Sequence, residues 1–166
     1  NLFIKKSYHV ERFISERFKN KLAQLLEKEH FDVVQLEMLY MTPYVETIRA
    51  HSKAMIVLRA HNVEHKIWER IAKETKFFLK RWYINHLAKT LKEYELKALE
   101  TVDGIAAITR KDAAFFRKYS SKPIIDIPYG VYPEQFTPKY EIEGKPKFYH
   151  IGSMNWMPNE EGIRWF

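Results

Sequence analysis

The amino-acid sequence predicts an α/β protein built on an incomplete, Rossmann-like parallel sheet. Short apolar runs of about five residues alternate with longer segments in which apolar residues recur at helical spacing. Strands that alternate with helices pair in parallel, because each helix carries the chain back to the edge at which the previous strand began. Helices are expected on both faces of such a sheet.

The first part of the chain is expected to supply two strands. Apolar residues at helical spacing predict one amphipathic helix over residues 7–30. The apolar runs at 32–36 and 54–58 are expected to be strands. Between them, Thr42 is expected to act as N-cap and Pro43 as the first-turn proline of a further helix.

The same alternation continues to about residue 127. Apolar residues at helical spacing predict three more helices, and two short apolar runs predict two more strands. The helices are expected around residues 67–71, over 77–102 and around 111–119, and the strands at 104–108 and 124–127.

The prolines and glycine near residue 140 predict a domain boundary. Residues 1–138 are expected to be the later part of a first Rossmann-like domain, and 139–147 a linker, since proline fixes φ and removes a hydrogen-bond donor. Residues 148–166 are expected to begin a second domain with a strand at 148–151 and a helix from Asn159. The apolar residues of that helix need a partner, so more of this domain is expected to follow.

Composition limits the classes of partner and chemistry. The chain has 166 residues, a net charge of +7 and an isoelectric point near 9.4. This positive field attracts nucleic acid, anionic lipid or a sugar nucleotide. The absence of cysteine excludes disulfides and thiolate chemistry, and makes the cytoplasm the default location. The sequence has no signal-peptide pattern and no apolar run of about 20 residues.

Candidate site residues follow the predicted strands. In an open parallel sheet, ligands bind beyond the carboxyl ends of the strands, where helix N-termini favour anions. The residues at these ends are Glu37, Tyr40, His61, Asn62, Thr109, Tyr129, Gly130, Gly152 and Ser153. No metal-binding spacing, G-x-S-x-G or P-loop occurs, so no metal site is expected and the common hydrolase and NTPase classes are excluded. The histidines at 51, 61 and 65 are expected at the surface.

An ordered set of motifs resembles the group 1, retaining glycosyltransferases of the GT-B fold, especially those of bacterial surface-polysaccharide synthesis. The motifs span most of the chain beyond Phe31, and residues 1–30 have no counterpart. They are FDVVQLE at 31–37, RAHNVE at 59–64, VDGIAAIT at 102–109, IPYGV at 127–131 and IGSMNWMPN at 151–159. The resemblance implies a two-domain enzyme of which this chain holds the later half of the first domain and the start of the second.

The resemblance assigns roles to the first-domain residues. It implies that His61 and Asn62 lie near the transferred sugar and serve catalysis, where an imidazole can exchange hydrogen bonds as charge develops. Alternatively, both residues only cap the helix that begins near Val63. The resemblance also implies that Glu37, Tyr40 and Thr109 face the acceptor, although Glu37 and Tyr40 equally fit a solvated loop.

The resemblance also assigns roles near the domain boundary. Tyr129 and Gly130 are implied to form the hinge, and Gly152 and Ser153 to place backbone N–H groups against the donor diphosphate. Alternatively, Gly152 only forms a tight turn between strand and helix, which also favours glycine. The sequence departs from the family pattern, since it lacks the usual Arg and Lys after Gly152, the paired glutamates and the early Gly-rich loop. The 166 residues by themselves are therefore expected to be inactive.

The resemblance predicts sugar transfer from a nucleotide-sugar donor to a carbohydrate or lipid-linked acceptor, without a cofactor. The segment from Lys73 to Lys97 interleaves lysines with aromatic residues and could contact an anionic inner membrane. Alternatively, its aromatics belong to the core and its lysines are solvated. Competing functions are a sugar-nucleotide epimerase of the same fold and a basic module that binds RNA or membrane. Nucleic acid is not the expected partner, because no RNP-like or KH-like motif occurs.

Overall fold

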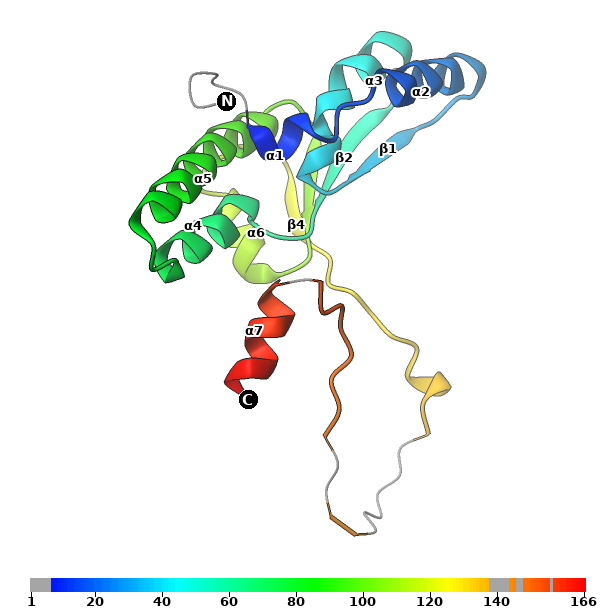
Figure 1. Ribbon diagram of the computed structural model, residues 1–166. Coiled ribbons are helices and arrows are strands. Elements are labelled where there is room, and N and C mark those ends of the chain that lie inside the picture. Colours follow the sequence, from blue (N-terminus) through cyan, green and yellow to red (C-terminus); the bar gives the residue numbers. More distant parts are fainter. Residues whose placement is uncertain (1–6, 138–143, 146–147, 156) are drawn as a thin grey trace. The chain divides into compact units, whose positions relative to one another are not determined.

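The structure is a computed structural model that describes residues 7–137, 144–145, 148–155 and 157–166. It divides into two compact units, Asn1–Tyr129 and Gly130–Phe166. The first unit holds the sheet and most of the helices (Figure 1).

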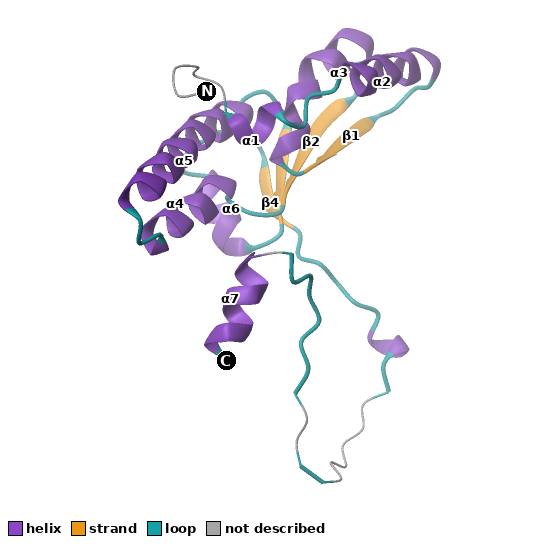
Figure 2. Ribbon diagram, in the orientation of Figure 1, coloured by secondary structure: helices purple, strands orange, loops and turns teal. Residues whose placement is uncertain are grey.

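The first unit is built on a four-stranded sheet in which all neighbouring strands are parallel. The strands lie in sequence order, β1-β2-β3-β4. Figure 2 shows them in orange. This arrangement confirms the α/β class and the parallel sheet predicted from the alternation of elements. The strand bounds are β1 Val33–Glu37, β2 Met55–Ala60, β3 Gly104–Ala107 and β4 Ile124–Asp126.

Helices connect successive strands. A 3-10 helix and α3 lie between β1 and β2, a pair of long helices between β2 and β3, and one short helix between β3 and β4. Two more helices precede β1. The bounds are α1 Tyr8–Glu11, α2 Glu16–Lys28, η1 Leu39–Tyr44, α3 Val45–His51, α4 Glu64–Glu74, α5 Phe78–Ala98 and α6 Arg110–Phe116.

Within the described residues, the core lies on one face of the sheet. Leu36, Ile56 and Ile105 point to this face and belong to one buried cluster with Ile48 of α3 and Phe116 of α6. A sequential strand order explains this, because right-handed crossovers between adjacent parallel strands all fall on the same side.

The opposite face of the sheet carries exposed apolar side chains. Val33 and Met55 are partners in the register of β1 and β2, and Ile125 lies on the same face of β4. All three side chains are exposed. The prediction of helices on both faces is therefore wrong for the part of the chain that the structure describes, because strand order was not available from periodicity.

The first predicted helix is divided in two. Tyr44 causes the break, because its hydroxyl donates to the Phe13 carbonyl at 2.7 Å and accepts from the Ser15 N–H at 2.9 Å. Ser15 then caps α2 by accepting from the Phe18 N–H. One continuous helix over residues 7–30 is therefore wrong, and the interruption depends on a residue 29 positions away.

Thr42 does not act as the predicted N-cap. It lies with Pro43 inside η1, and its hydroxyl donates to the Leu39 carbonyl at 2.7 Å and pairs with the Tyr94 hydroxyl at 2.8 Å. The chain turns into η1 directly after β1, so the helical segment begins before the position that the Thr-Pro pair indicates.

The second unit contains a 3-10 turn, η2 Pro133–Gln135, and the helix α7 Met157–Trp165. The helix agrees with the one expected from Asn159. The strand expected at 148–151 is wrong, since these residues are neither helix nor strand and no partner strand lies among the described residues of this unit. A strand forms only where a neighbour completes its hydrogen bonds. Most of the predicted linker, 139–147, lies outside the described residues, and the domain assignment stays a prediction.

Candidate functional site

A polar cluster lies where β1 and β2 end. It consists of Glu37, Arg59, His61 and Tyr129, and is called the carboxylate–histidine cluster here. The parallel register places Glu37 beside Arg59, and His61 follows two residues later. The chain returns to the same edge after β4, which brings Tyr129 alongside. Sheet topology therefore joins residues up to 92 positions apart.

Glu37 and His61 form the central contact of this cluster. The distance from His61 Nε2 to Glu37 Oε2 is 2.7 Å, and the Tyr129 hydroxyl lies 3.3 Å from the same nitrogen. The Arg59 guanidinium lies 4.9 Å from the centroid of the Tyr129 ring, within cation–π range. The Arg59 Nε is 3.9 Å from Glu37 Oε2. A carboxylate and an aromatic hydroxyl thus both contact Nε2 of His61.

The electrostatics of the cluster determine which of Glu37 and His61 carries the proton of their hydrogen bond. The hydrogen bond from His61 is the main cause that holds the pKa of Glu37 below its usual value. Burial opposes it, and a hydrogen bond from Gln35 and the charges of His61 and Arg59 lower the pKa further. Glu37 is therefore ionised at neutral pH and can only accept. Nε2 of His61 must carry the proton of this bond, which leaves Nδ1 of a neutral ring as a proton acceptor.

A strained residue adjoins the cluster. Met38 follows Glu37 and has φ 73° and ψ 156°, a backbone region occupied almost only by glycine. Its N–H still donates to the Arg59 carbonyl at 3.0 Å. This geometry keeps β1 paired with β2 for one more residue while the chain turns into η1. Strain of this kind costs about 1–3 kcal/mol and is concentrated at functional sites in proteins.

A second, buried polar group anchors the start of α4. It consists of Tyr40, Glu64, His65 and Glu95, and is called the α4 anchor here. The Glu95 carboxylate accepts from the N–H groups of Glu64 at 2.9 Å and His65 at 3.2 Å. It also lies 2.5 Å from His65 Nδ1. Tyr40 donates to Glu64 Oε2 at 2.9 Å. Since α4 begins just after Asn62, this group also fixes the loop that carries His61.

Burial dominates the electrostatics of the α4 anchor. Desolvation raises the pKa of Glu64, and the charge of Glu95 adds to this effect, while hydrogen bonds from Tyr40 and Asn62 oppose it. Desolvation, followed by the charge of Glu64, also raises the pKa of Tyr40. Tyr40 therefore stays protonated and acts as a donor throughout the neutral range.

The alternative that His61 and Asn62 only cap α4 is wrong. The N-cap of α4 is Val63, whose side chain offers no acceptor. The free N–H groups of the first turn are satisfied by Glu95, a residue of α5. The two loop residues are therefore not used as helix caps.

Tyr40 and Thr109, the other predicted site residues of the first unit, fall outside the carboxylate–histidine cluster. Tyr40 stacks on Phe13, with ring centroids 4.8 Å apart, and its hydroxyl is directed at Glu64. Thr109 is the N-cap of α6, where its hydroxyl accepts from the Asp112 N–H at 3.0 Å and donates to Asp112 Oδ2 at 2.8 Å. The acceptor contacts assigned to these residues stay predictions.

The predicted phosphate-binding turn lies in the second unit. A Cβ at Gly152 would approach Nε2 of His150 to 2.5 Å and Nδ2 of Asn159 to 2.8 Å, so the turn is closely packed by side chains. Asn159 donates to the Ser153 carbonyl at 3.1 Å and links the turn to α7. The boundary between the two units falls between Tyr129 and Gly130. The phosphate-binding and hinge roles stay predictions.

Two functional candidates were not singled out from the sequence. Arg59 follows the strand pattern as one more residue of β2, and only its pairing opposite Glu37 reveals a place in the cluster. Glu95 lies in the last turn of the long helix α5 and gives no local sign that it caps another helix. Alternation along β1 could have linked Gln35 with Glu37, because residues two apart share a face, and their side chains are 2.5 Å apart.

The histidines occupy different environments. His65 is buried, which corrects the expectation that it lies at the surface, whereas His51 is exposed as expected and pairs with Glu27 at 3.0 Å. The described residues contain no group of three or more histidine, cysteine or acidic side chains placed to hold a metal ion. In the same part of the chain, no helix combines the length and apolar character needed to cross a membrane.

Comparisons of the chain with protein-family models, curated proteins and solved structures gave no match. The parallel α/β architecture and the geometry at the carboxyl edge of its sheet are therefore the observations from which a function can be inferred.

Proposed function

We propose that this chain takes part in transferring a sugar from a nucleotide-sugar donor to a carbohydrate or lipid-linked acceptor. The observation that carries the proposal is the 2.7 Å contact between Glu37 and His61 at the carboxyl edge of the sheet. Ligands of open parallel sheets bind at this edge. A histidine oriented by a carboxylate is an arrangement suited to accept a proton from a hydroxyl group.

The proposed chemistry uses Nδ1 of His61. In sugar transfer the acceptor oxygen bonds to the anomeric carbon, the bond from that carbon to the donor diphosphate breaks, and the acceptor hydroxyl loses its proton. In the neutral form of the ring, Nδ1 is the acceptor nitrogen and can take this proton. Glu37 then stabilises the positive charge on the ring. In this proposal Tyr129 and Arg59 hold the pair in place.

Glu95 and Met38 support the same site indirectly. Glu95 fixes the first turn of α4 and so limits movement of the loop containing His61 and Asn62. Met38 accepts an unfavourable backbone conformation directly after Glu37. Both features favour a rigid site, and a rigid arrangement lowers the cost of orienting reacting groups.

The test measures release of nucleoside diphosphate. Because the 166 residues by themselves are expected to be inactive, the full-length protein that carries them is incubated with a panel of nucleotide sugars and a lipid extract that contains lipid-linked saccharides. His61→Gln is expected to lower the rate by about a hundredfold or more, as for loss of a general base. Glu37→Gln is expected to lower it less, because the base remains. His30→Gln serves as the matched control, since His30 is an exposed histidine outside the cluster.

Three results would contradict the proposal. The first is the absence of diphosphate release with every nucleotide sugar. The second is an unchanged rate in His61→Gln. The third is isomerisation of the sugar without any acceptor, which would favour an epimerase.

A further inference from the structure

The turn between α4 and α5 exposes a run of eight consecutive residues, 76–83. α4 ends at Glu74 and α5 begins at Phe78, so this run forms the end of a helical hairpin. Five of the eight residues are large and apolar, and are called the aromatic tip here: Phe77, Phe78, Leu79, Trp82 and Tyr83.

The aromatic tip is not part of the core. Phe77, Phe78 and Trp82 are 60%, 64% and 59% exposed, and Leu79 and Tyr83 are 55% and 40% exposed. The alternative in which the aromatics of this segment belong to the core is therefore wrong. Contiguous apolar surface of this kind is rare on soluble proteins unless it binds a partner.

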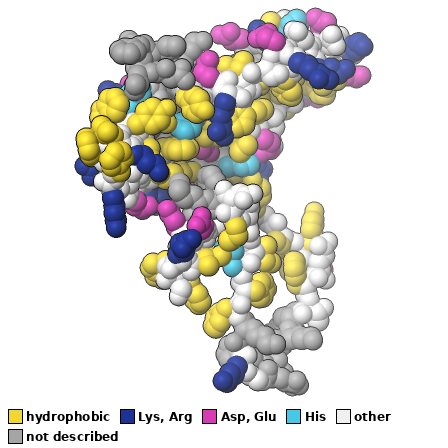
Figure 3. Space-filling view, in the orientation of Figure 1, with side chains coloured by type: hydrophobic (Ala, Val, Ile, Leu, Met, Phe, Trp, Pro, Cys, Tyr) yellow, Lys and Arg dark blue, Asp and Glu magenta, His cyan; other side chains and the backbone are white. Residues whose placement is uncertain are grey.

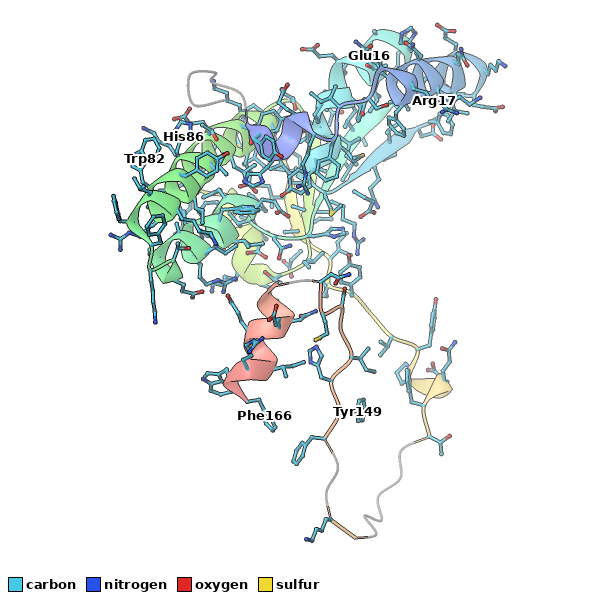
Figure 4. The ribbon with its side chains drawn as sticks, in the orientation of Figure 1. Glu16, Arg17, Trp82, His86, Tyr149 and Phe166 are labelled. Carbon is cyan, nitrogen blue, oxygen red and sulfur yellow. The ribbon has the colours of Figure 1, made fainter. Side chains whose placement is uncertain are left out.

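The rest of α5 supplies the core contacts of the hairpin. Ile84, Leu87, Ala88 and Leu91 are buried. The positions 78, 79, 82 and 83 share one side of the first turns, because residues three and four apart are neighbours on a helix. Trp82 stacks on His86 with ring centroids 6.4 Å apart, and Figure 4 shows both projecting from the outer side of α5.

Basic residues surround the aromatic tip. Lys73 and Lys76 precede it, and Lys80 and Arg81 lie within it. All four side chains are exposed, and none forms a salt bridge within the part of the chain that the structure describes. Figure 3 shows hydrophobic side chains gathered at this end of the hairpin, with Lys and Arg side chains beside them.

We propose that the aromatic tip docks the protein onto the surface of an anionic lipid bilayer. Its aromatic and aliphatic side chains would enter the boundary between headgroups and acyl chains, where tryptophan and tyrosine are favoured. The four basic residues would contact the lipid phosphates. The docking is peripheral and does not depend on the proposed sugar transfer.

Charge favours an anionic lipid surface over a second copy of the chain as the partner of the aromatic tip. A symmetric dimer through the tip would bring Lys76, Lys80 and Arg81 of both copies together, and like charges in contact are unfavourable. An anionic surface satisfies the apolar and basic parts of the tip at the same time. An apolar cluster that contains an aliphatic residue, Leu79, also fits acyl chains better than the stacked bases of RNA.

The experiment measures cosedimentation of the protein with phosphatidylcholine vesicles, with and without about 30 mol% phosphatidylglycerol. Binding is expected with the anionic vesicles, and weaker binding at high salt. Lys80→Gln combined with Arg81→Gln is expected to lower the partition coefficient about thirtyfold, from two lost basic contacts. Lys19→Gln combined with Lys21→Gln on α2 removes the same charge elsewhere and is expected to change it little.

A second pair of substitutions tests the apolar part of the surface. Phe78→Ser combined with Trp82→Ser is expected to abolish vesicle binding at low and high salt. The thermal unfolding midpoint is expected to stay within a few degrees of the unsubstituted protein, since both side chains are exposed. In the unsubstituted protein, the tryptophan emission is expected to shift to shorter wavelength on binding, and Trp82→Phe is expected to remove most of that shift.

Three outcomes would overturn the docking proposal. In the first, the tip variants bind vesicles as well as the α2 control. In the second, vesicles do not bind and the Phe78 and Trp82 substitutions dissociate a dimer. In the third, the tip binds RNA in a salt-sensitive way while vesicles do not bind. Because no sugar nucleotide is present, none of these results bears on sugar transfer.

Discussion

Replacing Glu95 by glutamine tests whether the α4 anchor stabilises the fold. The Glu95 carboxylate is buried and accepts from two backbone N–H groups and the His65 ring. Glutamine keeps one acceptor oxygen but turns an NH₂ group toward the remaining donors. An unsatisfied buried donor costs about 1–3 kcal/mol, and the lost charge weakens the remaining bonds. Together these effects predict a loss of about 2–4 kcal/mol in the free energy of unfolding.

Urea denaturation followed by circular dichroism measures this loss. Glu93→Gln is the matched control, since Glu93 lies exposed on the same helix and surface substitutions change stability by about 0.5 kcal/mol or less. Hydrogen exchange should also become faster at the amides of Glu64 and His65. If Glu95→Gln unfolds at the same urea concentration as Glu93→Gln, the carboxylate does not anchor α4 and the proposed fixing of the His61 loop is refuted.

Three further substitutions have distinct signatures. Burial holds the pKa of Glu64 above 4.5, so the stability that its protonated form contributes is lost as pH rises through the pKa of the folded protein. Glu64→Gln should therefore be more stable than the unsubstituted protein at pH 8, and melting curves should show this advantage disappear below pH 4.5. Arg49 donates to Asp103 at 2.7 Å, which lowers the pKa of the Asp103 carboxyl from 3.8. Asp103→Asn should therefore lower the free energy of unfolding by about 1–2 kcal/mol at neutral pH. This difference from the unsubstituted protein should narrow below pH 3.8, and a difference that does not narrow would count against the ion pair. Met38→Gly should raise the free energy of unfolding by about 1 kcal/mol, because glycine adopts the positive φ without strain. Met38→Ala should give no such gain, and equal melting temperatures for the two variants would argue against strain at Met38.

The candidate site was partly accessible from the sequence. Glu37, His61 and Tyr129 each follow a short apolar run, and the rule that ligands bind beyond the carboxyl ends of parallel strands was enough to single them out. Their association into one cluster is a result of topology. The same rule also selected Tyr40 and Thr109, whose hydroxyls bond Glu64 and Asp112 instead.

The predicted bounds of helices and strands were wrong where contacts with distant residues decide them. Ser15 lies inside a continuous helical pattern, yet the Tyr44 hydroxyl bonds both sides of the break. Residues 148–151 have the composition of a strand but no strand partner among the described residues of their unit. Local propensity is a weak guide in both cases, because tertiary contacts override it.

The sequence by itself determined the alternation of strands and helices, the parallel sense of the sheet and the polar residues at the strand ends. These properties depend on short-range periodicity and on the length of each connection. Tertiary structure decided which face of the sheet is covered, that Arg59 lies beside Glu37, that Glu95 anchors a helix 30 residues away and that Phe78 and Trp82 face outward. Each of these depends on strand order, register or burial, which arise from contacts between residues far apart in the chain.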